Sequence, residues 1–298
     1  MSLEVEVPPE PAAPPAAAPP PAPSAELPLT VIEPRPGWHL VDLNELWRFR
    51  ELLGFLIWRD IKVKYKQTAL GAAWAVLQPL ASMFVFTLFL GNLAGNRDPH
   101  VPYALYVFSG MLLWTTFANA LTAAGQSVVA SQNLVTKVYF PRLLIPLGAI
   151  GAVAMDFLIG CGVLAVMMAY YRVAPGWDIL IAPLLMLALA MTAAGLGILL
   201  SALTVAYRDF RHVIPFTVQL GMFATPSIFI RTATFGPRGQ LALMLNPVHG
   251  VIVNFRAAVL NQPFDWPSLG NALWISLALL VFGCLYFRRV ERQFADII

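Results

Sequence analysis

The chain has 298 residues, of which 58% are hydrophobic and 12% charged, and its formal net charge is +3. The charged share is about half that of ordinary soluble domains, which excludes a soluble globular protein and indicates an integral membrane protein. The placement of the charges along the chain is therefore more informative than their sum.

Residues 1–36 differ in composition from the rest of the chain. Proline and alanine dominate from Pro8 to Pro28, and glutamates supply most of the charges. Such a segment cannot bury enough apolar surface to offset chain entropy, so we predict a disordered cytoplasmic tail with polyproline II character. The basic start and apolar core of a signal peptide are missing. A plain linker is favoured, and a proline-rich ligand for a partner domain is the alternative.

Residues 37–68 are predicted to form an amphipathic helix in the membrane interface, because charged and apolar residues separate onto opposite faces at helical spacing. The charged face holds Arg48, Glu51, Arg59, Lys62 and Lys66, and the apolar face holds Leu46, Phe49, Leu52, Leu53, Leu56 and Ile57. Trp47 and Trp58 suit the headgroup level. Alternation over Ile61–Lys66 would also fit a strand, but a lone strand at a membrane leaves its backbone groups unpaired.

Six apolar runs downstream are each long enough to cross a hydrocarbon core of roughly 30 Å as a helix. They cover residues 70–93, 103–124, 143–169, 179–203, 213–230 and 269–287. We therefore predict an all-α integral membrane protein with a six-span domain over residues 69–298. Lysines and arginines concentrate in every second connection and beside both outer spans, which predicts cytoplasmic N- and C-termini.

The segment over residues 238–262 is apolar but interrupted at Asn246-Pro247 and at Gly250. A seventh span here would carry the basic C-terminal cluster to the outer side, against the charge distribution. Broken backbone at membrane depth is tolerated where protein or a water-filled cavity covers it. We therefore predict a re-entrant pair of short helices.

Motifs for catalysis are missing from the sequence. It holds no G-x-x-x-x-G-K-[ST] loop for nucleotide phosphates, no H-E-x-x-H and no Cys-x-x-Cys, so we predict no catalytic residue, metal or cofactor in this chain. The acid clearly inside a span is Asp156. An intramembrane ionisable residue is a functional candidate, and a structural role as hydrogen-bond acceptor for a neighbouring helix is equally open.

Four stretches in order carry a resemblance to a known family. They are KYKQT-x-LG-x-x-W-x-x-x-x-P (64–79), NLVTKVYFPRLLIPL (133–147), AYRDFRHVIPF (206–216) and LNPVHGVIVNFR (245–256). From about Trp47 onward the chain resembles the permease subunit of ABC-2 type polysaccharide exporters, which move O-antigen, capsular polysaccharide or teichoic acid. The resemblance implies a type V exporter-like fold in a bacterial inner membrane. It also implies a channel between two copies of this chain, with ATP and Mg²⁺ on two copies of a separate ATPase subunit.

The resemblance and the residue chemistry together suggest two substrate-contacting sets. A polyprenyl diphosphate headgroup from the inner leaflet would meet a basic platform: Arg59, Lys62, Lys64 and Lys66. The alternative for these cations is topology and contact with anionic lipid. Aromatic rings that pack on the C–H faces of sugars are predicted to line the channel: Trp74, Phe84, Phe223 and Phe229. The alternative for these rings is contact with lipid or packing between helices.

A coupling helix is predicted over residues 132–141, because an apolar helix of about two turns is not stable alone in water and needs a groove. The resemblance places it against the ATPase, and the alternative is a loop folded back on this chain. Its residues are Asn133, Leu134, Val135, Lys137, Val138, Tyr139 and Phe140. The resemblance also implies an outer gate formed by Asn246, Pro247, His249, Asn254 and Arg256.

Two function classes remain at this point. A membrane-embedded lipid-linked glycan transferase needs clustered acids or histidines that hold a metal and a diphosphate, and Asp156 alone does not provide them. A transport subunit needs no catalytic residue, so we predict the permease of an exporter for lipid-linked polysaccharide. An exporter of a drug or simple lipid is the nearer alternative. The expected partners are the ATPase, a second copy of this chain, polyprenyl-diphosphate-linked polysaccharide and membrane lipids, and no nucleic acid.

Overall fold

The computed structural model describes residues 43–66, 73–90, 101–230, 235–291 and 294, and the regular elements in these ranges are all helical. The predicted all-α fold is thereby confirmed, while the predicted tail over residues 1–36 lies outside the described ranges. Within those ranges, five units are long and apolar enough to cross a membrane. They are α3 (Ala73–Leu90), α4 (Tyr103–Ala130), α6 (Leu144–Tyr171), η1 with α7 (Trp177–Ala206) and α11 (Trp266–Val290).

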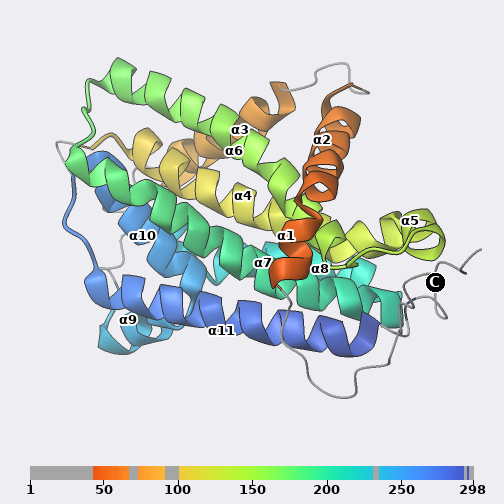
Figure 1. The fold of residues 1–298 in the computed structure, drawn as a ribbon. Coiled ribbons are helices and arrows are strands. Elements are labelled where there is room, and N and C mark those ends of the chain that lie inside the picture. The colour runs from red at the N-terminus through yellow and green to blue at the C-terminus, as the bar shows by residue number, and fades with distance from the viewer. Residues whose placement is uncertain (1–42, 67–72, 91–100, 231–234, 292–293, 295–298) are drawn as a thin grey trace, which may run out of the picture. The chain divides into compact units, whose positions relative to one another are not determined.

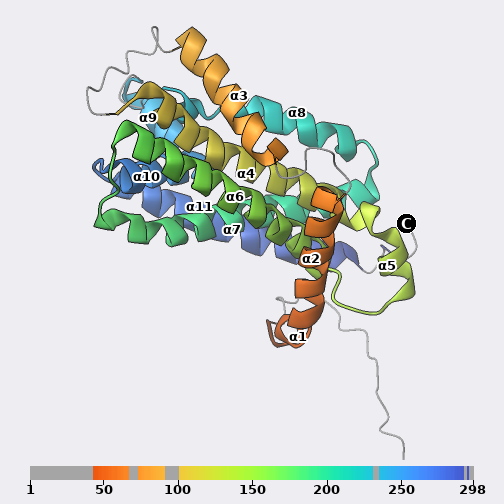
Figure 2. The same cartoon turned by 90° about the horizontal axis from the view of Figure 1, so that it is seen from above.

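Helix α4 is the central element, and α3, α6 and α7 pack against it (Figures 1 and 2). Its core side chains include Leu105, Phe108 and Leu113, which are completely buried. The helix has 28 residues, six more than the predicted span. It is about 42 Å long at 1.5 Å per residue. Because this exceeds the thickness of the hydrocarbon core, part of the helix lies outside that core. Helix α5 (Gln132–Lys137) follows its C-terminal end.

The predicted interface helix forms as α1 (Leu43–Arg48) and α2 (Arg50–Lys66), which continues as a helix through the stretch that alternates in the sequence. The apolar face of α2 packs on α6, where glycines replace side chains at the contact. Leu56 is buried next to Gly148. On the charged face of the same helix Glu51, Lys62 and Lys66 are exposed, so α2 combines a protein contact with a surface that remains polar.

The predicted fifth span forms a shorter helix followed by a bend. Helix α8 (Phe210–Phe223) has 14 residues and is therefore about 21 Å long, less than the hydrocarbon core. Thr225 leaves the helical conformation at φ −119° and ψ 63°, and a 3-10 turn, η2 (Pro226–Ile228), follows. The reason lies in Pro226, which has no N–H to donate and disfavours helical geometry at the residue before it.

The predicted re-entrant segment forms two helices, α9 (Pro237–Met244) and α10 (Pro247–Leu260), with a bend of 100° between them. Asn246 sits at the bend, and its side chain accepts hydrogen bonds from the backbone N–H groups of Val248 and His249. This cap satisfies backbone donors that the start of a helix leaves unpaired. The break predicted at Asn246-Pro247 is therefore confirmed.

The two ends of the described membrane domain lie at the same end of the helices. Arg288, near the end of α11, pairs with Glu45 of α1 at 3.2 Å. Arg142, just before α6, donates a hydrogen bond to the backbone carbonyl of Glu291. Neighbouring ends require an even number of crossings between them. Since five units are of full length, either the α8–η2 segment or the bent pair supplies the sixth crossing.

Helices α7 and α11 approach so closely that a side chain would not fit at their crossing. A Cβ atom on Gly195 would lie 2.5 Å from backbone atoms of Leu279 and Leu280. Thr192 and Ser276, one turn away, share a hydrogen bond of 2.6 Å across the same contact. Small residues and interhelical hydrogen bonds are the usual means by which helices associate in lipid.

We predict that Gly195→Ala destabilises the protein by about 1–3 kcal/mol, because the added methyl group meets backbone that cannot move aside easily. The measurement is thermal unfolding of the purified protein in one detergent. Gly162→Ala in α6 is the matched control, since nothing lies within 4 Å of its Cβ position. Equal unfolding temperatures for the two variants would contradict the close approach of α7 and α11.

Candidate functional site

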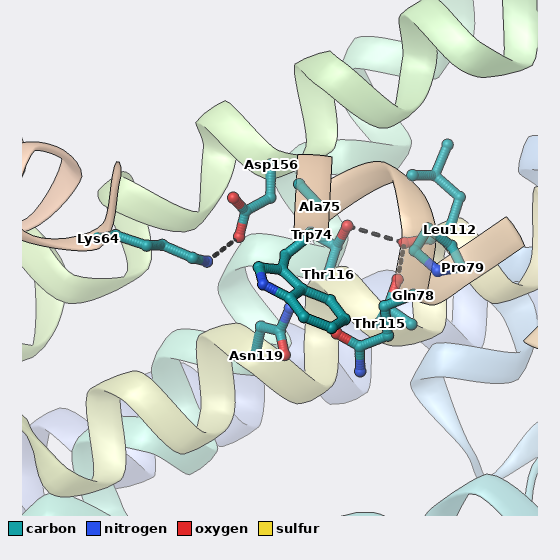
Figure 3. A pocket seen from close by; sticks show the side chains of 10 residues that line it. All are labelled: Lys64, Trp74, Ala75, Gln78, Pro79, Leu112, Thr115, Thr116, Asn119 and Asp156. Atoms are coloured by element: carbon teal, nitrogen blue, oxygen red, sulfur yellow. Dashed lines mark hydrogen bonds and ion pairs between the residues drawn. The ribbon is translucent and has the colours of Figure 1, made fainter. Parts of the chain in front are cut away.

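A polar pocket lies where the last turn of α2 meets α3, α4 and α6, and Figure 3 shows it with its lining side chains. Lys64 forms an ion pair with one carboxylate oxygen of Asp156, and the hydroxyl of Tyr65 donates to the other oxygen. Asp156 is buried within α6. It accepts hydrogen bonds from a neighbouring helix, so the structural role left open for it is observed.

Tyr65 is a donor that stays protonated. Burial raises the pKa of its hydroxyl well above the ordinary value, and the hydrogen bond to Asp156 and the charge of that carboxylate raise it further. Because the hydroxyl keeps its proton at physiological pH, it can always donate a hydrogen bond to Asp156 under those conditions. Tyr65 therefore supplies Asp156 with a second donor that does not depend on Lys64.

The remaining walls of the pocket come from α3 and α4. Trp74 and Gln78 of α3 face Thr116 and Asn119 of α4, and the pocket has a volume of about 80 Å³. A cavity needs roughly 10–15 Å³ of such space to hold one water molecule, so this pocket takes several waters or one compact polar group. It is too small for a chain of sugars. The pocket is thus suited to a small charged group and not to a polymer.

The four cations predicted to meet a headgroup do not form one cluster. Arg59 pairs with its neighbour Asp60 at 2.8 Å, and Lys62 lies over the ring of Trp58 with its nitrogen 5.3 Å from the centroid. Lys66 is exposed. Lys64 is the member of the set that reaches into the pocket. The proposal of a headgroup contact therefore has its strongest structural support at Lys64.

The predicted channel-lining aromatics divide in the same way. Trp74 lies on the pocket wall, and Phe84 and Phe223 are both exposed. Phe229 is only 6% exposed, and its ring stacks on Phe86 with the centroids 3.9 Å apart. Because this ring is buried inside a single chain, a channel-lining role for Phe229 has less structural support than the same role for the exposed rings, and it stays a prediction.

The predicted coupling segment is shorter as a helix and faces two ways. Helix α5 ends at Lys137, and Val138 is extended at φ −129° and ψ 134°. Val135 and Phe140 are buried in a cluster that includes residues of α2 and α11. Tyr139 is 89% exposed. One side of the segment thus holds it to this chain, while its outer side, with Asn133, Lys137 and Val138, is exposed.

Arg256 fixes the bent segment to the centre of the fold. Its buried guanidinium donates to the backbone carbonyls of Tyr106 and Ser227 at 3.0 Å each, and it lies 3.5 Å from the centroid of the Tyr106 ring. These contacts join α10 to α4 and η2. The carbonyl of Ser227 belongs to the turn where the helix is interrupted, so Arg256 supplies a donor that the backbone there lacks.

The other residues of the predicted outer gate also lie in the interior of this segment. Asn254 is buried, donates to the carbonyl of Gly250 and accepts from the backbone N–H of Asp265 at the start of α11. Pro247 and His249 are buried within α10. Asn246, Asn254 and Arg256 therefore hold the bent pair in place, and all five residues present little surface to a substrate. The gate itself stays a proposal.

Sequence reasoning missed several residues of these sites. Gln78 and Asn119 are polar residues inside apolar runs, and that signal was available in the sequence. The tie between Tyr65 and Asp156, 91 positions apart, left no local pattern. Neither did the contact of Tyr106 with Arg256.

Known proteins are similar to this chain over most of its length. A family model described as ABC-2 type transporter matches residues 51–260, a range that holds both the pocket and Arg256. The O-antigen export system permease protein RfbA of Myxococcus xanthus is 26% identical and covers 85% of this chain and 98% of its own length. A protein of the same name from Klebsiella pneumoniae is 24% identical, with coverage of 83% and 95%. The capsule polysaccharide export inner-membrane protein CtrC of Neisseria meningitidis serogroup B is 24% identical, with coverage of 78% and 89%.

We predict that Arg256→Met destabilises the protein by roughly 3 kcal/mol, because buried carbonyls lose their donor and each unsatisfied group costs about 1–3 kcal/mol. Thermal unfolding in detergent measures the loss. Arg238→Met is the control, since it removes the same charge from an exposed position on α9. A loss of equal size in both variants would show that the buried contacts of Arg256 add nothing.

Proposed function

This chain belongs to the ABC-2 type transporter family, and we propose that it is the permease subunit of an ATP-driven exporter of polysaccharide. The observation that carries the proposal is the agreement of relatives with two different cargoes. Permeases named for O-antigen export and for capsule polysaccharide export both match this chain over most of its length. What the two cargoes share is a long glycan, so a glycan is the substrate class that we propose.

As a permease, the chain does not hydrolyse ATP itself, and it works with an ATPase partner. It is a multi-pass protein of the inner membrane. We further propose two copies of each subunit, with the channel between the two permeases. The exposed aromatic residues of α3 and α8, such as Phe84 and Phe223, are the candidates for its lining, because they project from the body of a single chain.

The orientation with cytoplasmic termini is also a proposal. Its support is that the cationic segments meet at one end of the helices. Arg142, Arg288 and the N-terminal helices lie there together, and Lys137 of α5 belongs to the same region of the chain. Since basic connections stay in the cytoplasm, this end is the one that would meet an ATPase.

We propose that the exposed side of residues 132–139 is the surface that docks on the ATPase. The buried side chains of Val135 and Phe140 connect that surface to a cluster that includes residues of α2 and α11. A force applied to the exposed side therefore reaches the membrane helices through packed side chains. An exposed aromatic residue such as Tyr139 is a suitable anchor, because aromatic side chains in pockets concentrate the energy of small interfaces.

Deletion of the gene tests the proposed function. We expect loss of long-chain polysaccharide from the cell surface and accumulation of lipid-linked glycan inside the cell, both reversed by the wild-type gene. Glycan gels and mass spectrometry of the lipid fraction provide the readouts. An unchanged surface glycan, with no lipid-linked intermediate retained, would reject polysaccharide export.

We predict that Tyr139→Ala uncouples transport without damage to the fold, because its side chain contacts solvent in this chain. Copurification of the ATPase should fall severalfold, or ATP hydrolysis should continue without export, while the unfolding temperature stays unchanged. Phe140→Ala is the contrasting variant, because it empties a buried site and should lower the unfolding temperature. Full assembly and full export by the Tyr139 variant would assign the contact elsewhere.

A further inference from the structure

The two charges at the pocket differ in exposure. The side chain of Lys64 is 46% exposed, whereas that of Asp156 is 10% exposed. An enclosed carboxylate needs its donors, because a buried charge without a partner is strongly unfavourable. A lysine on a flexible four-carbon stem that is about half exposed can change partners more readily than the enclosed carboxylate. The pair therefore has one fixed member and one movable member.

Tyr65 makes a change of partner feasible. It donates to the oxygen of Asp156 that Lys64 does not contact. If Lys64 turns away, Asp156 keeps a donor in place, and the buried carboxylate is not left bare. The raised pKa of Tyr65 ensures that the proton for this hydrogen bond is present.

The rest of the pocket fits a phosphate group. Its volume of about 80 Å³ admits a compact anion, and the amides of Gln78 and Asn119 line it together with Lys64. Lysine binds phosphate as a point charge, and a diphosphate carries more negative charge than one carboxylate. An anion that enters the pocket thus competes directly with Asp156 for Lys64.

We propose that this pocket binds the diphosphate of a lipid-linked substrate by exchange: Lys64 leaves Asp156 for the phosphate, and Tyr65 retains the carboxylate. This inference rests on the proposed function, export of a lipid-linked glycan, and on the polyprenyl diphosphate linkage expected for that glycan. Competition from Asp156 thereby sets a minimum negative charge for a ligand, since weakly charged lipids do not displace Asp156 from Lys64. The exchange also loosens one tie between α2 and α6 when substrate arrives, while the tie through Tyr65 persists.

The test is an isothermal calorimetric titration of the purified permease–ATPase complex with farnesyl diphosphate, which measures the dissociation constant. Asp156→Asn removes the competing charge at constant size, so the dissociation constant should fall by about three- to tenfold, the effect of losing a partly exposed ion pair. Tyr65→Phe should raise the dissociation constant by about threefold, because Asp156 then lacks the Tyr65 hydroxyl as a donor when Lys64 leaves. Lys64→Gln should raise it about tenfold or more.

Arg50→Gln is the matched control, since it removes a positive charge from the same helix at its other end and should leave binding unchanged. Farnesol, which lacks the diphosphate, tests whether that group is needed for binding. Inorganic diphosphate, added as a competitor, tests whether the diphosphate binds without a lipid. Displacement of farnesyl diphosphate by inorganic diphosphate would show that the phosphate group alone is recognised. The absence of displacement would show that the prenyl chain is needed as well.

Opposite shifts for Asp156→Asn and Tyr65→Phe support the exchange. Unchanged or weaker binding by a stable Asp156→Asn protein, or an equal gain in farnesol binding, would overturn it. If Asp156→Asn unfolds, Tyr65→Phe decides, because a dissociation constant that does not rise also overturns the exchange. These titrations need no export, so a failed exchange alongside a glycan defect in the deletion strain leaves the proposed function standing.

Discussion

A polar group inside the hydrocarbon layer has to find its hydrogen-bond partner within the protein, because lipid tails offer none. In this chain Arg256 is met by backbone carbonyls of α4 and η2, and Thr192 of α7 by Ser276 of α11. Asp156 of α6 is met by Lys64 and Tyr65 of α2. Each match joins segments that are distant in sequence. The polar contacts thus fix which helices are neighbours, while the apolar surfaces by themselves would permit several arrangements.

The helices and their faces could be read from the sequence, because they follow from periodicity and from single residues with strong local effects. The apolar side of α2 and the break at Asn246-Pro247 are examples. Contacts across the fold could not be read, because they depend on how helices turn toward one another. The burial of Phe229 and Phe140 and the partner of Asp156 belong to this second kind. The short α8 is an intermediate case. Pro226 in the sequence indicates an interruption, but the apolar run over residues 213–230 predicts a full span.

The two candidate contact surfaces of the proposed exporter meet on the same structural elements. Helix α2 contributes Lys64 to the pocket and Leu56 to the cluster that also holds Val135 and Phe140. A change at the pocket and a change at the exposed side of residues 132–139 therefore act on one helix, at Lys64 near its end and at Leu56 near its middle. Such an arrangement provides a physical route by which substrate occupancy and ATPase binding can affect each other, without a separate signalling element.

The ion pair between Glu45 and Arg288 has a consequence for biosynthesis. Glu45 belongs to the first described helix and Arg288 to the end of the last one, 243 positions later. A ribosome releases the C-terminal segment last, so α1 cannot acquire this partner until translation of the membrane domain is complete. Domains generally form in the order of synthesis. Helix α2 can pack on α6 earlier, but α1 gains its contact with Arg288 only after the last span has been made, and a chain truncated before α11 would leave α1 without this contact.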